Sequence, residues 1–147
     1  MRKQQLQVLL VEDSDNDADL FSLAATRSSA RIKIEVVTDG EEAVRYLRRQ
    51  NQFLAATVPD LILLDLNLPK KHGKEVLAEV KGDPQLKSIP VLVLTTSSAP
   101  DDIAYCYGAG AAGYLIKPDD FGELVKLIQK LSDFWILIDF PLAGSIV

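Results

Sequence analysis

The stretch Leu-Ile-Leu-Leu-Asp-Leu at residues 61–66 carries the most information about the fold. It is an apolar run interrupted by a single carboxylate, Asp65. Strands that are apolar on both faces are typical of a parallel sheet with helices on both sides, because both faces are then buried. Similar runs occur at residues 6–11 and 90–94. The sequence therefore predicts a parallel sheet that contains residues 61–66 as its third strand.

Segments with helical periodicity separate the apolar runs. In the segment 15–27, Leu20, Leu23 and Ala24 share one face, and Ser14 or Asp15 is placed to cap the start of a helix. Five strands that alternate with five helices indicate an α/β fold, a flavodoxin-like (βα)5 three-layer sandwich with strand order 2-1-3-4-5. The strands are predicted at 6–11, 32–37, 61–66, 90–94 and 112–116, and the helices at 15–27, 41–53, 73–80, 101–107 and 120–131.

Composition narrows the range of functions. The 147 residues carry a formal net charge of −5, which argues against direct binding to nucleic acid, because phosphate contacts need clustered Lys and Arg. The single cysteine, Cys106, excludes an intrachain disulfide and fits a reducing compartment. No apolar run reaches the length of a bilayer span or of a signal peptide. We therefore expect a cytoplasmic protein with no membrane partner.

Three carboxylates follow the first and third predicted strands. Glu12 and Asp13 end the first strand, and Asp65 lies near the end of the third. In the predicted sheet the strand order reverses between these two strands, and ligands of such sheets bind there, at the carboxyl ends of the strands. Taken singly, Asp13 is equally well explained as a helix cap and Asp65 as a residue that ends a strand. Together they predict a site for a hard cation, Mg²⁺, which offsets their repulsion and prefers oxygen ligands.

Polar side chains also end the fourth and fifth strands. Thr95 would place a hydroxyl near Asp65, and Lys117 would reach across to neutralise an oxyanion. The alternatives are an ordinary threonine at a strand end and a solvated lysine. The sequence leaves open whether the peptide bond before Pro118 is cis. His72, the only histidine, is assigned to a surface loop, with a metal or phosphate contact as the alternative.

The motifs together resemble the receiver domain of two-component signalling over residues 6–132. They are Glu12-Asp13 after an apolar strand, the segment 63–69 around Asp65, Gly73, the segment 91–96 that ends in Thr95-Thr96, and the segment 110–118 that ends in Lys117-Pro118. The resemblance implies that Asp65 is the phosphoacceptor and that Lys117 holds a phosphoryl oxygen. It further implies a switch pair, Thr95 and Tyr114, and the Mg²⁺ ligands Glu12, Asp13, Asp65 and the backbone carbonyl of Asn67.

The function implied by the resemblance is that of a single-domain response regulator phosphorylated by a histidine kinase. Such a protein is not an enzyme beyond its self-catalysed phosphotransfer and dephosphorylation. The long segment 49–59, the sequence Leu66-Asn67-Leu68-Pro69 and Phe134-Trp135 resemble regulators that serve phytochrome-type histidine kinases. Asp119 departs from the family pattern, in which an apolar residue is frequent at this position.

Two other functions are compatible with parts of the sequence. The first is a receiver-like interaction module that works without phosphate, against which the intact set Asp13, Asp65, Thr95 and Lys117 argues. The second is a flavodoxin-like electron carrier, which would need a phosphate-binding loop after the first strand. The segment 12–15 is anionic instead. We therefore favour the phosphorylated switch.

The end of the sequence is unusually apolar for a domain whose core is already complete. We assign residues 6–133 to the receiver domain and residues 134–147 to an apolar tail without an effector domain. An apolar tail with Phe134 and Trp135 is typical of an interface. The prediction is a homodimer through the fourth helix, fifth strand, fifth helix and tail. The alternatives are a tail that folds back on its own domain and a contact with the kinase.

Overall fold

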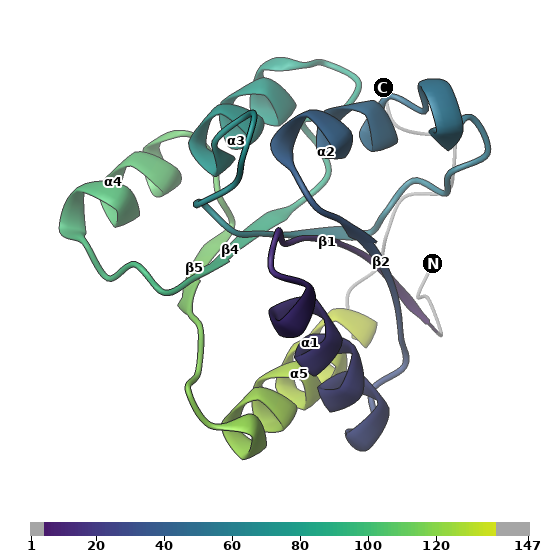
Figure 1. Ribbon diagram of the computed structural model, residues 1–147, viewed down its shortest axis with the longest axis vertical. Coiled ribbons are helices and arrows are strands. Elements are labelled where there is room, and N and C mark those ends of the chain that lie inside the picture. The colour runs from purple at the N-terminus through teal and green to yellow at the C-terminus, as the bar shows by residue number, and fades with distance from the viewer. Residues whose placement is uncertain (1–4, 138–147) are drawn as a thin grey trace.

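Five parallel strands form the middle layer of the protein, in the order β2-β1-β3-β4-β5 (Figure 1). The computed structural model describes residues 5–137. The strands are β1 (Leu6–Val11), β2 (Ile32–Val37), β3 (Leu61–Leu64), β4 (Val91–Thr95) and β5 (Gly113–Ile116). The helices are α1 (Asp15–Arg27), α2 (Gly40–Leu47), α3 (Gly73–Gly82), α4 (Pro100–Gly108) and α5 (Phe121–Ile136), with a 3-10 turn η1 (Asn51–Phe53). The predicted fold class and strand order are confirmed.

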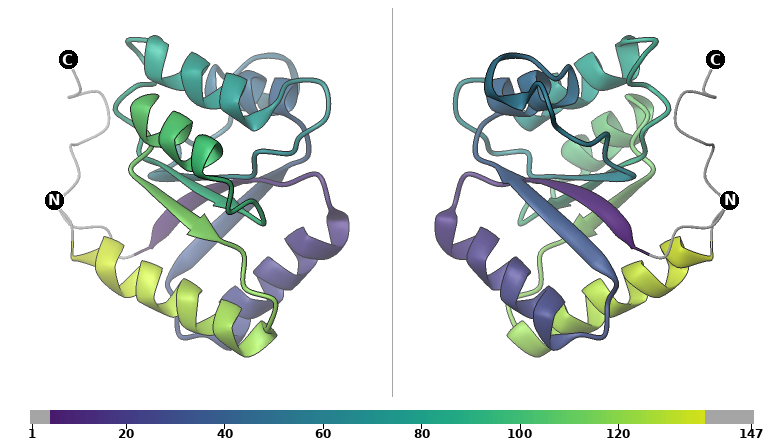
Figure 2. Two further views of the ribbon diagram at one scale, coloured as in Figure 1. Left: turned by 90° about the vertical axis from the view of Figure 1, so that its left-hand side faces the viewer. Right: turned by 90° about the vertical axis from the view of Figure 1, so that its right-hand side faces the viewer.

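Helices cover both faces of the sheet (Figure 2). α1 and α5 lie on one face, and α2, α3 and α4 lie on the other. Successive side chains of a strand point to opposite faces, so each central strand contributes to two cores. Leu9, Val11 and Leu64 pack in the core beneath α2 and α3, whereas Leu10 and Leu63 pack against α1 and α5. The double burial explains why β1, β3 and β4 are apolar at nearly every position. Within residues 5–137, no helix is both long and apolar enough to cross a bilayer.

Two helix boundaries differ from the predicted ones by more than two residues. α2 ends at Leu47 instead of residue 53, because Arg49 and Asn51 take left-handed backbone angles, with φ of 53° and 55°. The polar run 48–52 gives a longer helix no apolar face to bury. Phe53 nevertheless reaches the core from η1, where its ring lies 5.2 Å from that of Tyr46.

α5 continues five residues beyond the predicted end at residue 131. Ile128, Leu131 and Trp135 repeat at intervals of three and four, which keeps one helix face against the core. Trp135 is only 8% exposed, whereas Phe134 and Leu137 are 59% and 66% exposed. The residues 134–136 that we assigned to a tail therefore belong to α5. The rest of the predicted tail beyond Leu137 lies outside the described residues.

Candidate functional site

The register of the central strands brings the three predicted carboxylates together. Val11 pairs with Leu64, so β1 and β3 end at the same level. The Asp65 N–H donates to the carbonyl of Val11 at 3.1 Å, which fixes the chain just past β3. Carboxylate oxygens of Glu12, Asp13 and Asp65 lie within 4.8 Å of one another. Glu12 and Asp65 are buried and Asp13 is exposed, so the cluster opens to solvent on one side.

The Asp65 side chain is held by the backbone that follows it. Its Oδ1 accepts hydrogen bonds from the N–H groups of Leu66, at 2.7 Å, and Asn67, at 3.4 Å. Gly73, at the start of α3, packs directly on the carbonyl of Asp65, where a Cβ atom would overlap it. Gly73 also donates its N–H to the carbonyl of Leu66 at 2.8 Å. A glycine is therefore needed at position 73 to let α3 approach the carboxyl end of β3.

Lys117 pairs with two of the three clustered carboxylates, those of Glu12 and Asp65. It follows β5, and its Nζ lies 2.5 Å from Glu12, 3.1 Å from Asp65 and 3.2 Å from Asp17. Burial alone would lower the pKa of Lys117, but the hydrogen bond to Glu12 and the charge of Asp65 outweigh burial and raise it. Burial raises the pKa of Glu12, an effect that the contact with Lys117 opposes. Lys117 is thus a permanent cation whose charge allows the carboxylates to be buried.

Asp17 is a member of the site that we did not predict. It lies in the first turn of α1, and its backbone N–H donates to the Ser14 side chain, which caps the helix. The cap orients the first turn so that the Asp17 carboxylate faces Lys117. A signal existed in the sequence, because the segment 12–17 carries four carboxylates directly after β1.

Thr95 and Tyr114 lie on the neighbouring strands β4 and β5. Thr95 is fully buried, and its Oγ1 lies 3.5 Å from the N–H of Ser97, at the limit for a hydrogen bond. The Tyr114 hydroxyl donates to the Ser97 carbonyl at 2.9 Å. Both predicted switch residues therefore contact the same residue, Ser97, in the loop between β4 and α4.

Ser97 belongs to a polar chain that the sequence analysis missed. Its hydroxyl donates to Asp102 of α4 at 2.6 Å, and Asp102 also pairs with Lys74 of α3 at 2.6 Å. The hydrogen bonds from Lys74 and Ser97 lower the pKa of Asp102. Lys74 additionally lies 5.2 Å from the ring centre of Tyr105. This chain ties the loop after Thr95 to two helices.

The structure also places His72, the peptide bond before Pro118 and Asn67, about which the sequence made predictions. His72 caps α3, and its Nδ1 accepts from the N–H of Lys74 at 3.0 Å. The peptide bond before Pro118 is trans, since the described residues contain no cis bond. The Asn67 N–H faces Asp65, and its carbonyl stays a predicted metal ligand.

The acidic cluster fits a small divalent cation. All three clustered side chains offer oxygen, the donor that Mg²⁺ prefers at about 2.1 Å. Two oxygens on one octahedral ion lie about 3–4 Å apart. The separations in the cluster, up to 4.8 Å, therefore require only a small inward movement of Glu12, Asp13 and Asp65. Lys117 supplies part of the compensating charge and would have to share the carboxylates with the ion.

Comparison with known proteins assigns the family. A family model described as the response regulator receiver domain matches residues 8–129. Response regulator Rcp1 of Synechocystis is 43% identical over 129 residues, which cover 88% of each chain.

Two solved structures have the same fold. The phosphorylated cyanobacterial phytochrome response regulator RcpA is 42% identical with a TM-score of 0.84, covering 92% of this chain and 97% of that one. The Mn²⁺-bound form of Rcp1 is 41% identical with a TM-score of 0.83, covering 92% and 99%. The chain therefore belongs to the response regulator receiver family.

Proposed function

We propose that this protein is a signalling switch in which Asp65 accepts a phosphoryl group from a histidine kinase in a Mg²⁺-dependent reaction. The observation that carries the proposal is the convergence of Glu12, Asp13, Asp65 and Lys117 at the carboxyl ends of β1, β3 and β5. Phosphoryl transfer requires mainly positioning and neutralisation of charge, and this arrangement supplies both.

In the proposed transfer, an oxygen of Asp65 forms a bond to phosphorus and the bond from phosphorus to the donor breaks. When the donor is a phosphohistidine, the electron pair of the P–N bond stays on the imidazole nitrogen, which takes up a proton. Asp65 becomes an acyl phosphate. Its backbone contacts with Leu66 and Asn67 hold the carboxylate while Lys117 turns toward the phosphoryl oxygens.

The metal would be held by Glu12, Asp13, Asp65 and the backbone carbonyl of Asn67. When bound, Mg²⁺ would neutralise charge on the phosphoryl oxygens. The Mn²⁺-bound structure of the relative Rcp1 supports a divalent cation in this family. We propose that self-catalysed transfer and hydrolysis at Asp65 are the only reactions of the protein.

The proposed signal leaves the site through Thr95. A phosphoryl group on Asp65 adds negative charge and acceptor oxygens. We expect the Thr95 hydroxyl to move toward them, which removes its weak contact with the N–H of Ser97. Tyr114 holds the Ser97 carbonyl, so movement of this loop and of Tyr114 is coupled. The output surface would be α4 and β5.

The proposed partner is a phytochrome-type histidine kinase in the cytoplasm. The support comes from the relative RcpA, which is described as a cyanobacterial phytochrome response regulator and is 42% identical over nearly the whole chain.

We also propose a homodimer through α4, β5, α5 and the end of the chain. Tyr107, Ile116, Phe134 and Leu137 expose apolar surface on these elements. Trp135 faces its own core and is not an anchor for a partner, which corrects the role that we gave it. The double variant Phe134→Ser/Leu137→Ser should weaken association in sedimentation experiments. Unchanged association would rule out the end of α5 as part of the interface.

Incubation with acetyl phosphate and Mg²⁺, followed by intact-mass measurement, tests the phosphorylation. We expect the mass of one phosphoryl group on the parent chain and none on Asp65→Asn. Equal labelling of both chains would reject Asp65, and no labelling of the parent would favour the phosphate-independent interaction module. Thr95→Ala should accept phosphate but lose the change in the loop after β4, whereas Thr95→Ser, which keeps the hydroxyl, should retain it.

A further inference from the structure

β2 is an edge strand whose outer side has open hydrogen-bonding groups. In the sheet order it has one neighbour, β1, and no other strand of residues 5–137 pairs with it (Figure 2, right). The carbonyl of Arg31 accepts from Leu6 of β1 at 2.8 Å, and that of Val37 accepts from Glu12, directly after β1, at 3.0 Å. Orientation alternates along a strand, so Lys33 and Glu35 also direct their backbone groups to β1. Ile32, Ile34 and Val36 therefore direct their N–H and carbonyl groups outward.

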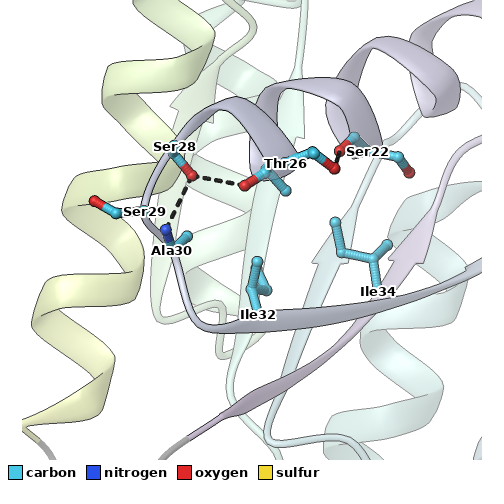
Figure 3. A pocket seen from close by; sticks show the side chains of 8 residues that line it. Ser22, Thr26, Ser28, Ser29, Ala30, Ile32 and Ile34 are labelled. Carbon is cyan, nitrogen blue, oxygen red and sulfur yellow. Dashed lines mark hydrogen bonds between the residues drawn. The ribbon is translucent and has the colours of Figure 1, made fainter.

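Hollows lie beside this edge on both faces of the sheet. One, of about 440 Å³, lies between Ile32, Ile34 and the end of α1, and the two isoleucine side chains point toward that helix (Figure 3). The other, of about 290 Å³, is bordered by Lys33, Glu35 and the ring of Tyr46. A strand added to a sheet sends its side chains alternately to the two faces. The hollows therefore lie where the side chains of an added strand would go.

The side chains of β2 are complementary to themselves in one antiparallel register. When Ile34 lies opposite Ile34 of a second copy, Ile32 of each copy lies opposite Val36 of the other. Lys33 of each copy likewise lies opposite Glu35 of the other, which gives two pairs of opposite charge. All outward backbone groups then face each other in hydrogen-bonded pairs. The Lys33 and Glu35 positions become the non-hydrogen-bonded pairs, in which side chains approach most closely. A twofold axis through Ile34 generates this contact.

The neighbouring registers are disfavoured by charge. The outward backbone groups face each other again only when one strand slides by two residues. Ile34 then lies opposite Ile32 or opposite Val36. The first of these registers places Lys33 opposite Lys33, and the second places Glu35 opposite Glu35. Like charges directly opposite each other destabilise a strand pair. Neither Lys33 nor Glu35 forms an ion pair with another described residue, and both are exposed. Their charges are therefore free to specify the register with a second copy.

We propose that two copies of this chain associate through β2, pairing antiparallel about Ile34 to form one continuous ten-stranded sheet. Charged residues on an edge normally oppose pairing with other strands. Here the same charges permit a single self-pairing and disfavour the others. The contact lies at the opposite edge of the sheet from β5, so it is separate from the dimer proposed above and does not depend on phosphorylation.

Cysteine cross-linking of the full chain tests the register directly. In a Cys106→Ala background, mild oxidation of a mixture of Lys33→Cys and Glu35→Cys chains of different mass should give a mixed dimer. That dimer retains one Lys33–Glu35 pair, and its two cysteines lie at the close, non-hydrogen-bonded position. Each variant alone should form disulfide-linked dimer more slowly than the mixture, because its cysteines face each other only in a shifted register. Linking of either variant alone as fast as in the mixture, or no link in the mixture, would overturn the proposal.

Charge exchange supplies an independent measurement. Lys33→Glu and Glu35→Lys should each weaken association in sedimentation by at least about tenfold, because two attractive pairs become repulsive. The double variant Lys33→Glu/Glu35→Lys restores complementarity and should regain the parent affinity. Lys87→Glu is the matched control, because Lys87 is exposed between α3 and β4 and lies outside both proposed contacts, and it should leave association unchanged. A double variant as weak as the single ones would contradict the pairing.

Discussion

Replacement of Lys117 by methionine should lower the free energy of unfolding more than removal of any other single lysine charge. Methionine keeps most of the aliphatic stem but removes the ammonium group. The Lys117 side chain is 16% exposed, and its partners Glu12 and Asp65 are 4% and 9% exposed. Removing one partner of a buried ion pair costs about 3–5 kcal/mol, because the other charge is left uncompensated. Asp17 is 45% exposed and adds less than about 1 kcal/mol.

Mg²⁺ should restore much of the stability that Lys117→Met loses. An ion that binds only the folded state adds about 2.7 kcal/mol at a hundred times its dissociation constant. In the parent chain the ion has to share Glu12 and Asp65 with Lys117, whereas in Lys117→Met it does not. We therefore expect Mg²⁺ to stabilise the variant more than the parent. The gap of about 3–5 kcal/mol in EDTA should narrow when the metal is added.

Urea unfolding at pH 7, followed by circular dichroism with EDTA or with Mg²⁺, measures both effects. The pKa of Lys117 is raised on folding, so its contribution is complete below the pKa of an unfolded lysine, about 10.4, and is lost only as the pH rises through the folded value. Lys126→Met is the control, since Lys126 and its partner Glu123 are exposed. A loss below about 1 kcal/mol in EDTA, or equal stabilisation of parent and variant by Mg²⁺, would refute the reasoning.

Three further predictions concern other parts of the molecule. Lys74→Met removes the stronger cause of the lowered pKa of Asp102, so NMR titration should find that carboxyl protonating at higher pH than in the parent. Trp135→Ala should destabilise the fold by about 3–5 kcal/mol in urea unfolding, whereas Phe134→Ala, on the exposed face, should change stability by less than about 0.5 kcal/mol. Burial raises the pKa of the Cys106 thiol, so a thiol reagent at pH 8 should label it only after unfolding.

The fold was predictable because a parallel sheet leaves a strong record in the sequence. Strands buried on both faces have to be largely apolar, and β1, β3 and β4 are apolar at every position except Gln7 and Thr95. Helix ends were less predictable. The polar run after Leu47 and the pair Ser132-Asp133 look alike as sequence, yet one ends a helix and the other does not. The difference is Trp135, which returns to the core one turn later.

The positions of the site residues were predictable for the same topological reason. Glu12, Asp65, Thr95 and Lys117 each follow or end a strand, and the carboxyl ends of parallel strands meet at one edge. The chain from Ser97 through Asp102 to Lys74 was not predictable. It depends on how closely α3 approaches α4, and that distance is set by packing between helices and by no local pattern.

The two proposed contacts use opposite edges of one sheet, and this has a consequence for assembly. An interface on β5 and α5 joins a copy on one side, and an interface on β2 joins another copy on the other side. Two different twofold contacts on one chain produce larger assemblies when both are occupied. The phosphorylation site lies between them, beside β1 and β3. If phosphorylation alters α4 and β5 through Thr95 and Ser97, only one of the two contacts responds, because the polar chain joins the loop after β4 to α3, α4 and β5, whereas β2 lies at the opposite edge of the sheet from β5. The size of the assembly, and not merely the strength of one dimer, would then depend on phosphate.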